Sequence, residues 1–227
     1  MLTVHLDCRY NVLYVWLILM NNEFMEKLLD PQWVDRGHFG KRDHFIMEDT
    51  VPDSLCDDVI SYYEECDYLK KYPGSYGDQG DHKGPDKKVS TDMSVHYLLI
   101  HNEPKLNKYF ACLDQIVVKY FNEYAFACMD STMHSIFNIQ KYPVGGGFKV
   151  WHSERGIDKE YLYRHLVWMT FLTDNPDGGT EFIYQDKYVP AKKGKTLIWP
   201  SDWTHTHRGK VDTTKEKMII TGWIDLK

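Results

Sequence analysis

The sequence predicts a mainly β protein with supporting helices, an α+β class in which helices come first and jelly-roll strands follow. Two observations support this fold class. Between Leu55 and Tyr124, apolar residues recur at helical spacing in two separate segments. After Ser131, short β-type runs alternate with turn residues, which is typical of an antiparallel sandwich or barrel and not of alternating βα units.

The N-terminal residues, 1–43, match no usable pattern and are interpreted as an extension of unknown role. Their apolar run at 12–20 is too short to span a bilayer and lacks the small-residue cleavage site of a secretory signal, so we expect a buried strand or short helix there. The remainder, 44–227, is expected to form one domain, with helical support in 44–130 and a β core in 131–227.

A first helix is expected after Pro52, with Ser54 and Asp57 spaced as a capping box. Its apolar stripe consists of Leu55, Val59, Tyr62 and Cys66. A second amphipathic helix should begin at Pro104, a favoured first helical residue, and end near Tyr124. Its stripe consists of Leu106, Phe110, Leu113, Val117 and Phe121. The intervening residues 72–91 are rich in Gly, Asp, Lys and Pro, which favours a surface loop.

Seven short strands are expected after the helices. They cover residues 135–142, 148–154, 165–172, 180–184, 187–189, 196–199 and 217–224, with turns at 145–147, 175–179 and 192–194. Because side chains alternate along a strand, the last strand should place Lys217, Ile219, Thr221 and Trp223 on one face. A lysine among apolar side chains on an inward face is costly unless an anion meets it.

Charge and cysteine content disfavour some classes of function. The 27 basic and 33 acidic residues give a formal net charge of −6, without the basic footprint that neutralises many phosphates, so no nucleic-acid partner is expected. The five cysteines form no C-x-x-C pair and are odd in number. Reduced thiols in a cytosol-like compartment follow, so we expect a cytoplasmic protein with no membrane partner.

Two histidines and a carboxylate have the spacing of a metal site. His152 and Glu154, two apart on an extended chain, project from the same face, and His207 can close the third corner. This is the ligand set of non-haem Fe(II) oxygenases, which leaves three positions for a bidentate 2-oxoacid and dioxygen. Glu154 fills the position that a halide would need, which favours hydroxylation over halogenation. Lys217 can neutralise the distal carboxylate of the oxoacid.

An ordered set of residues runs through this half of the chain. It consists of Tyr142, Gly145, Phe148, His152, Glu154, Arg164, Gly178, Gly179, Thr180, Phe182, Pro190, Gly194, His207, Gly209, Lys217 and Trp223. The set resembles the Fe(II)/2-oxoglutarate dioxygenases of the prolyl 4-hydroxylase type. The resemblance implies a double-stranded β-helix, the cofactors Fe(II), 2-oxoglutarate and dioxygen, and ascorbate as a further ligand. It also places Tyr142 and Trp223 near the co-substrate.

Two features depart from the family pattern. The usual aspartate is Glu154, and the distance from Phe148 to His152 is one residue longer, which predicts a bulge near 149–151. His205 competes with His207 for the third ligand position. The family's His-x-Gly pattern and its ten-residue distance to the lysine favour His207, which leaves His205 beside the site or on the substrate side.

The resemblance implies hydroxylation of a prolyl residue in a protein or peptide. A free amino acid or small metabolite is the next candidate substrate, and a 2-oxoglutarate or metal sensor without turnover is a separate class. Tyr142 and Trp223 could equally be packing aromatics. Arg164 is interpreted as a structural or surface arginine near the strand that lines the pocket.

Overall fold

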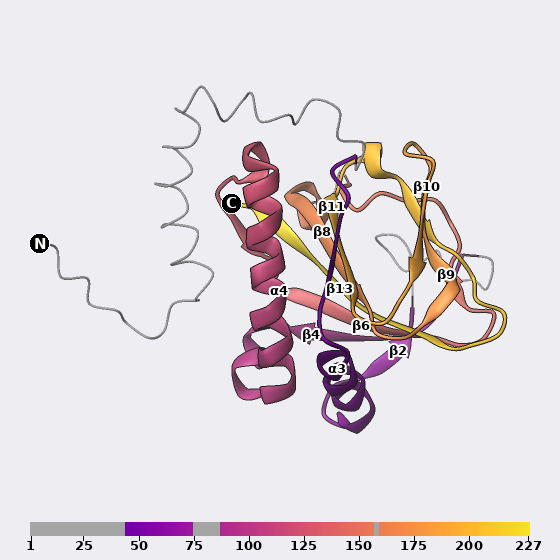
Figure 1. Cartoon of the computed structure of the whole chain (residues 1–227). Helices are drawn as coiled ribbons and strands as arrows, with labels where there is room; N and C mark the ends of the chain where they lie inside the picture. The colour runs from indigo at the N-terminus through magenta and orange to yellow at the C-terminus, as the bar shows by residue number, and fades with distance from the viewer. Residues whose placement is uncertain (1–43, 75–86, 157–158) are drawn as a thin grey trace, which may run out of the picture.

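The computed structural model describes residues 44–74, 87–156 and 159–227. The apolar run at 12–20 and the rest of the predicted extension lie outside the described residues. More of the described residues belong to antiparallel strands than to helices, and the two long helices lie early in the chain (Figure 1). The predicted mainly β jelly-roll class with supporting helices is confirmed. The predicted order, helices first and strands second, is wrong, because four strands lie between residues 47 and 96, before the second long helix.

The first helix, α3 (Asp53–Glu65), buries Val59, Tyr62 and Cys56 against the core, close to the predicted stripe. The predicted capping box is wrong. Pro52 occupies the N-cap and no side chain caps the helix, because the helix already begins at Asp53 and places Ser54 within its first turn. Asp57 instead accepts a hydrogen bond from Lys193 at 2.6 Å.

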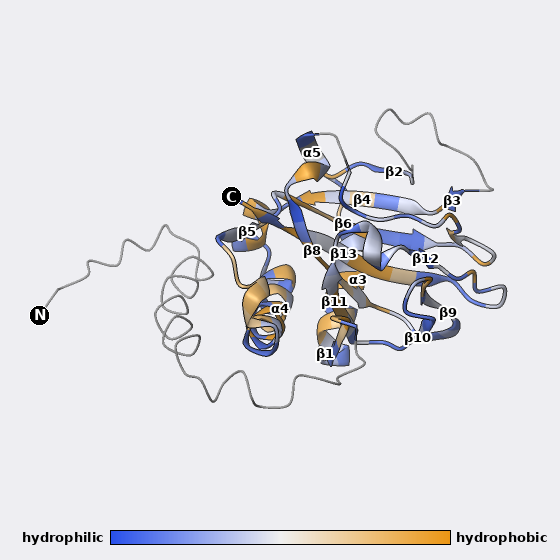
Figure 2. Ribbon diagram, turned by 90° about the horizontal axis from the view of Figure 1, so that it is seen from above, coloured by the Kyte–Doolittle hydropathy of each residue, from blue (hydrophilic) through white to orange (hydrophobic). Residues whose placement is uncertain are grey.

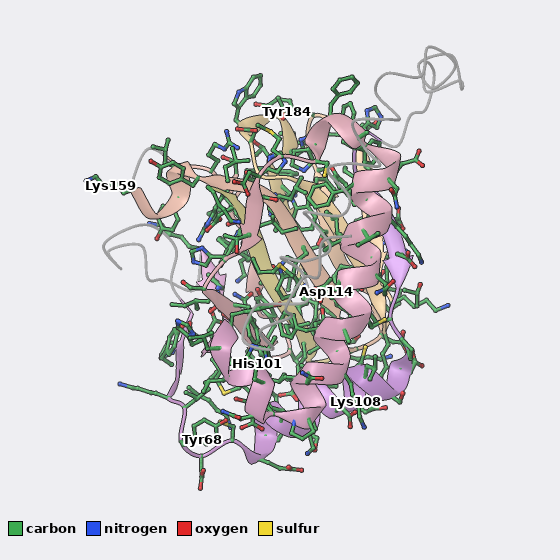
Figure 3. All side chains as sticks on the ribbon, turned by 90° about the vertical axis from the view of Figure 1, so that its left-hand side faces the viewer. Tyr68, His101, Lys108, Asp114, Lys159 and Tyr184 are labelled. Carbon is green, nitrogen blue, oxygen red and sulfur yellow. The ribbon has the colours of Figure 1, made fainter. Side chains whose placement is uncertain are left out.

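The second helix, α4 (Pro104–Glu123), confirms the predicted start, end and apolar stripe. It has a hydrophobic and a hydrophilic side (Figure 2) and lies alongside the strands, with Lys108 and Asp114 along its length (Figure 3). The Phe110 ring packs on Phe137 and Trp168, with ring centroids 4.7 and 5.6 Å apart. Burial of this aromatic stripe fastens α4 to the large sheet.

The large sheet contains eight strands and the small sheet three, all paired antiparallel. In spatial order the large sheet consists of β1 (Met47–Thr50), β11 (Lys195–Pro200), β8 (Arg164–Phe171), β13 (Lys217–Leu226), β6 (Ile136–Tyr142), β4 (Thr91–His96) and β2 (Lys71–Pro73), with β5 (Ser131–Met133) pairing β13. The small sheet consists of β10 (Lys187–Ala191), β9 (Asn175–Phe182) and β12 (His207–Gly209). A separate pair joins β3 (Lys88–Val89) and β7 (Gly147–Phe148).

Short helices connect these strands. They are α5 (Lys159–Leu162) and the 3-10 helices η1 (Tyr97–Asn102), η2 (Ala125–Ala127) and η3 (Trp203–His205). Among the described residues, no helix combines the length and apolar character needed to cross a membrane.

Alternation along the central strands divides the interior into two cores. On β8, Leu166 and Trp168 belong to the core under the helices, whereas Val167 and Met169 belong to the core between the sheets. Gly222 on β13 makes room for the Trp168 ring, since a Cβ there would lie 2.5 Å from it. The inner face of the large sheet therefore looks toward the small sheet, as in a jelly roll.

Three predicted segments need correction. The predicted surface loop at 72–91 is wrong at both ends, because β2, β3 and the start of β4 lie there; residues 75–86 are outside the described part. The predicted strand at 148–154 ends at Phe148 instead. The predicted turn at 175–179 belongs to β9, where Ala191 pairs with Asn175 and the register shifts between Val189 and Ala191.

Candidate active site

A cavity of about 620 Å³ lies against the inner face of the large sheet and is also lined by small-sheet residues. The structure brings all six predicted site residues to its wall: Tyr142, His152, Glu154, His207, Lys217 and Trp223. Ile219 and Thr221 line it too, so the predicted common face of the last strand is observed. That face carries Lys217 and Trp223 into one pocket because both strand neighbours of β13 fix its register.

His152, Glu154 and His207 offer ligand atoms that all lie within 4.8 Å of one another. Oε1 of Glu154 is 3.5 Å from Nε2 of His152 and 3.7 Å from Nε2 of His207. Backbone pairing fixes the two histidines, because each donates its N–H to the other's carbonyl oxygen, at 3.0 and 2.9 Å. This triangle has the composition and size to hold one divalent metal ion.

Backbone contacts also set the tautomers of the two histidines. Nδ1 of His152 is 3.0 Å from the Val150 carbonyl oxygen, and Nδ1 of His207 is 2.9 Å from that of His205. A carbonyl oxygen only accepts, so each Nδ1 carries the proton and donates it. Each Nε2 then presents a lone pair toward Glu154, which is the arrangement that metal-binding histidines need.

The electrostatics suit metal binding. Burial lowers the pKa of His207 to about 3, assisted by His152, so the ring is neutral at physiological pH. Burial by itself would raise the pKa of Glu154, but the nearby charge of Arg164, which donates a hydrogen bond to Oε2, holds it well below its ordinary value. A neutral imidazole and an ionised carboxylate are the forms that ligate a metal.

Lys217 is buried, with 4% of its surface exposed. Its ammonium donates to the carbonyl oxygens of Gly178 at 2.5 Å and Lys210 at 3.0 Å, and lies 5.0 Å from the centre of the Tyr142 ring. Among the described residues no carboxylate lies within 4.0 Å of it, and burial lowers its pKa to about 8. Asp212 acts on this ammonium only through its more distant charge, which raises the pKa. A buried cation with no carboxylate in direct contact, in a cavity wall, is suited to accept an anionic ligand.

Tyr142 lies beneath this lysine. Its hydroxyl donates to Oε1 of Gln140 at 2.6 Å, and burial raises its pKa well above the ordinary value, so it stays neutral. Nε2 of Gln140 lies 3.4 Å from Asp92, which forms a buried ion pair with Lys88 at 2.6 Å. Sequence reasoning missed these three polar residues because Lys88 fell in the predicted loop and the others carried no motif.

Arg164 lies near the strand that lines the pocket, as the resemblance implied, but it is buried in the pocket wall and not at the surface. Arg164 is 8% exposed and lines the cavity, where NH1 donates to Oε2 of Glu154 at 3.1 Å. Regular alternation would place it on the helix side with Leu166. A register irregularity skips His165, pairing Leu166 with Ile224 and Arg164 with Asp225, and thereby turns Arg164 inward.

His205 does not join the triangle. Its Nε2 is 2.7 Å from the His44 carbonyl oxygen, and its Nδ1 is 3.0 Å from the Thr204 hydroxyl. Its backbone carbonyl, however, accepts the hydrogen bond that orients His207. The chain also leaves the sheet between Phe148 and His152, where a bulge is predicted, and pairs again at His152.

Comparison with known proteins agrees with this geometry. Residues 137–225 match the 2OG-Fe(II) oxygenase superfamily. Over these residues, which carry the site, the chain is similar to the 2OG-Fe(II) oxygenases. The predicted recognition and the predicted enzyme class, a 2-oxoglutarate-dependent dioxygenase, are therefore confirmed. No curated protein matches the sequence.

Solved structures with the same fold include prolyl hydroxylases from three sources. The viral collagen prolyl hydroxylase of Paramecium bursaria Chlorella virus-1, solved with 2OG, has a TM-score of 0.59 and 15% identity over 83% of this chain and 98% of its own. A Pseudomonas putida prolyl-4-hydroxylase has a TM-score of 0.60 and 15% identity, over 86% of this chain and 97% of its own. A Trichoplax adhaerens prolyl hydroxylase has a TM-score of 0.55 and 13% identity, over 97% of this chain and 96% of its own. At these identities the likeness is one of fold.

The residues present fit the cofactors of an oxygenase of this superfamily, Fe(II), 2-oxoglutarate and dioxygen, and this prediction is confirmed at the level of the superfamily. The donor set offers two imidazole nitrogens and a carboxylate oxygen on one side of the cavity. Lys217 offers the cation for a dicarboxylate. The predicted ascorbate binding, cytoplasmic location and domain division are tested by none of these observations and stay predictions.

Proposed function

We propose that the oxygenase holds Fe(II) through His152, Glu154 and His207 and binds the distal carboxylate of 2-oxoglutarate with Lys217. One observation carries the proposal: a compact triangle of metal-binding atoms lines the same cavity as a buried lysine that contacts no carboxylate directly among the described residues. We assign this activity to a single domain over residues 44–227.

The chemistry of the bound cofactors is oxidative decarboxylation of 2-oxoglutarate to succinate and carbon dioxide, coupled to hydroxylation of an unactivated carbon. The chain's own residues bind, orient and keep out water. Phe148 stacks on the His152 ring at 3.8 Å, and the Trp199 ring meets His207 edge-on at 5.0 Å. These rings leave the two histidines little freedom to turn and cover their apolar edges.

The substrate we propose is a prolyl residue of a protein or peptide. The shared fold with prolyl hydroxylases supports this substrate class, and the Trichoplax enzyme was solved with a peptide fragment of the hypoxia inducible factor oxygen degradation domain. The cavity of about 620 Å³ is large enough for a proline ring in addition to the co-substrate. The net charge of −6 disfavours a nucleic-acid substrate.

Metal and co-substrate binding can be tested without a substrate. Under anaerobic conditions, addition of Fe(II) and 2-oxoglutarate should give a visible charge-transfer band in the wild type. His152→Ala should lose the band, because it removes one corner of the triangle. An unchanged band in this variant would remove the ligand assignment.

Turnover distinguishes a hydroxylase from a sensor. Succinate formation should increase with a prolyl peptide, and mass spectrometry should find one added oxygen on the peptide. The matched control is the same peptide with alanine in place of proline. Stimulation by free amino acids alone would assign the enzyme to small metabolites. If the protein binds 2-oxoglutarate but forms no succinate with either the peptide or the free amino acids, a sensor without turnover is the function that remains.

A further inference from the structure

Glu154 presents its two carboxylate oxygens to different partners. Oε1 faces the Nε2 atoms of His152 and His207, at 3.5 and 3.7 Å. Oε2 accepts hydrogen bonds from NH1 of Arg164 and Nε1 of Trp223, each at 3.1 Å. The family pattern has an aspartate at this position, so the extra methylene lets one side chain reach both sets of partners.

Both donors are held in place before any ligand arrives. NH1 of Arg164 also donates to the Glu154 backbone carbonyl at 3.1 Å. The guanidinium group lies over the rings of Trp223 and Tyr161, 3.6 and 4.3 Å from their centres. Trp223 is 9% exposed and its position on β13 is fixed by pairing with Val167 of β8. Stacking and pairing therefore aim both N–H groups at Oε2.

We propose that Arg164 and Trp223 form a carboxylate clamp that makes Glu154 a one-oxygen ligand. With Oε2 engaged by two donors, one of them charged, only Oε1 is available to the metal. A two-oxygen glutamate would occupy one of the three positions that a bidentate 2-oxoacid and dioxygen require. Arg164 is a positioning residue in this scheme. The inference rests on the proposed Fe(II) site and adds which residues orient its carboxylate ligand.

The clamp predicts that replacing Glu154 by the family's usual aspartate weakens metal binding. Glu154→Asp restores the usual residue, but it shortens the side chain by one C–C bond, about 1.5 Å. The shorter carboxylate cannot reach the two donors and the two histidines together. We therefore expect Glu154→Asp to weaken metal binding by about tenfold or more, the range found when partners of metal ligands are removed.

The experiment is an anaerobic titration of the full chain with Co(II), with the dissociation constant and the visible d–d spectrum as readouts. Trp223→Phe keeps a ring under Arg164 and removes only the donor, and Arg164→Met keeps length and removes the charge. Each should weaken Co(II) binding about 10- to 100-fold and change the spectrum. In the Glu154→Asp background, Trp223→Phe should have little further effect, because the clamp is already open.

Arg208 provides the matched control. It pairs with Glu181 at 2.7 Å and lies 4.3 Å from the centre of the Trp151 ring, so Arg208→Met removes a similar pair and stack whose side-chain partners are not among the three proposed ligands. Its Co(II) affinity should equal that of the wild type. Thermal unfolding of the metal-free variants separates loss of the clamp from loss of the fold.

The outcomes separate the two proposals. If His152→Ala binds Co(II) as tightly as the wild type, the metal site itself is wrong. If His152→Ala loses binding while Trp223→Phe and Glu154→Asp both stay within about twofold of the wild type, a change below that of partner loss, the site stands and the clamp is overturned. Should Arg164→Met fail to fold, Trp223→Phe and Glu154→Asp decide.

Discussion

The affinity for 2-oxoglutarate should fall as pH rises above 8, because the cation proposed to bind it loses its proton there. Burial lowers the pKa of Lys217 to about 8, from an ordinary 10.5. The charged fraction then drops from roughly 0.9 at pH 7 to roughly 0.1 at pH 9. Since apparent affinity scales with the fraction of competent protein, binding should weaken about tenfold over this interval.

Calorimetric titration of 2-oxoglutarate into Mn(II)-loaded protein under anaerobic conditions measures this change. At pH 9 the binding heat should also depend on the ionisation enthalpy of the buffer, because Lys217 takes up a proton as the carboxylate arrives. Lys217→Arg is the control, since a guanidinium group stays protonated at both pH values. It should show little pH dependence, whereas Lys217→Met should bind weakly throughout.

The reasoning is refuted if wild type and Lys217→Arg lose affinity in parallel between pH 7 and pH 9. Stability supplies a second check. Between pH 8 and pH 10.5 the unfolded chain holds more protons on Lys217 than the folded protein, so unfolding free energy rises with pH in that window. Lys217→Met removes this penalty, up to about 3 kcal/mol at pH 7, and its advantage over wild type should shrink toward pH 10.

Three further predictions concern stability and are checked by urea denaturation. Phe110→Ala should lower the unfolding free energy by about 3–5 kcal/mol, because a buried ring joins α4 to the large sheet. Gly194→Ala should cost about 1–3 kcal/mol, since φ is +81° and the new Cβ would lie 2.3 Å from the Val51 carbonyl oxygen. Asp92→Leu should cost about 3–5 kcal/mol by leaving Lys88 buried and unpaired, and adding Lys88→Met should recover most of it.

The order of short motifs, through its resemblance to the prolyl 4-hydroxylase pattern, predicted the three residues that the structure brings together. His152 and Glu154 are separated by one residue, and the ordered set around His207 and Lys217 distinguished His207 from His205. Helix α4 could also be predicted, because its burial follows one continuous 3.6-residue period. In each case the relevant information lies within one element or in the order of short motifs.

The polar wall of the cavity could not be predicted in this way. Lys88 lies in a stretch whose composition is typical of loops, yet its strand, β3, pairs with β7, which comes much later in the chain. Asp92 follows this stretch on β4, which pairs with the distant β6. The turn expected at 175–179 is wrong for the same reason, because its glycines and proline belong to an irregular part of β9 that pairs with β10. The composition of a segment cannot show which distant strand will hydrogen-bond to its backbone N–H and C=O groups.

Arg164 shows how a local irregularity changes function. Regular alternation from Leu166 would place it on the side of the core under the helices. The register irregularity at His165 reverses its direction, and Nε2 of His165 meets the Ala127 carbonyl oxygen at 2.7 Å instead. The same step brings Arg164 beside Glu154. The longer carboxylate and the irregular strand are thus two parts of one arrangement, and restoring only the family's aspartate should impair the site.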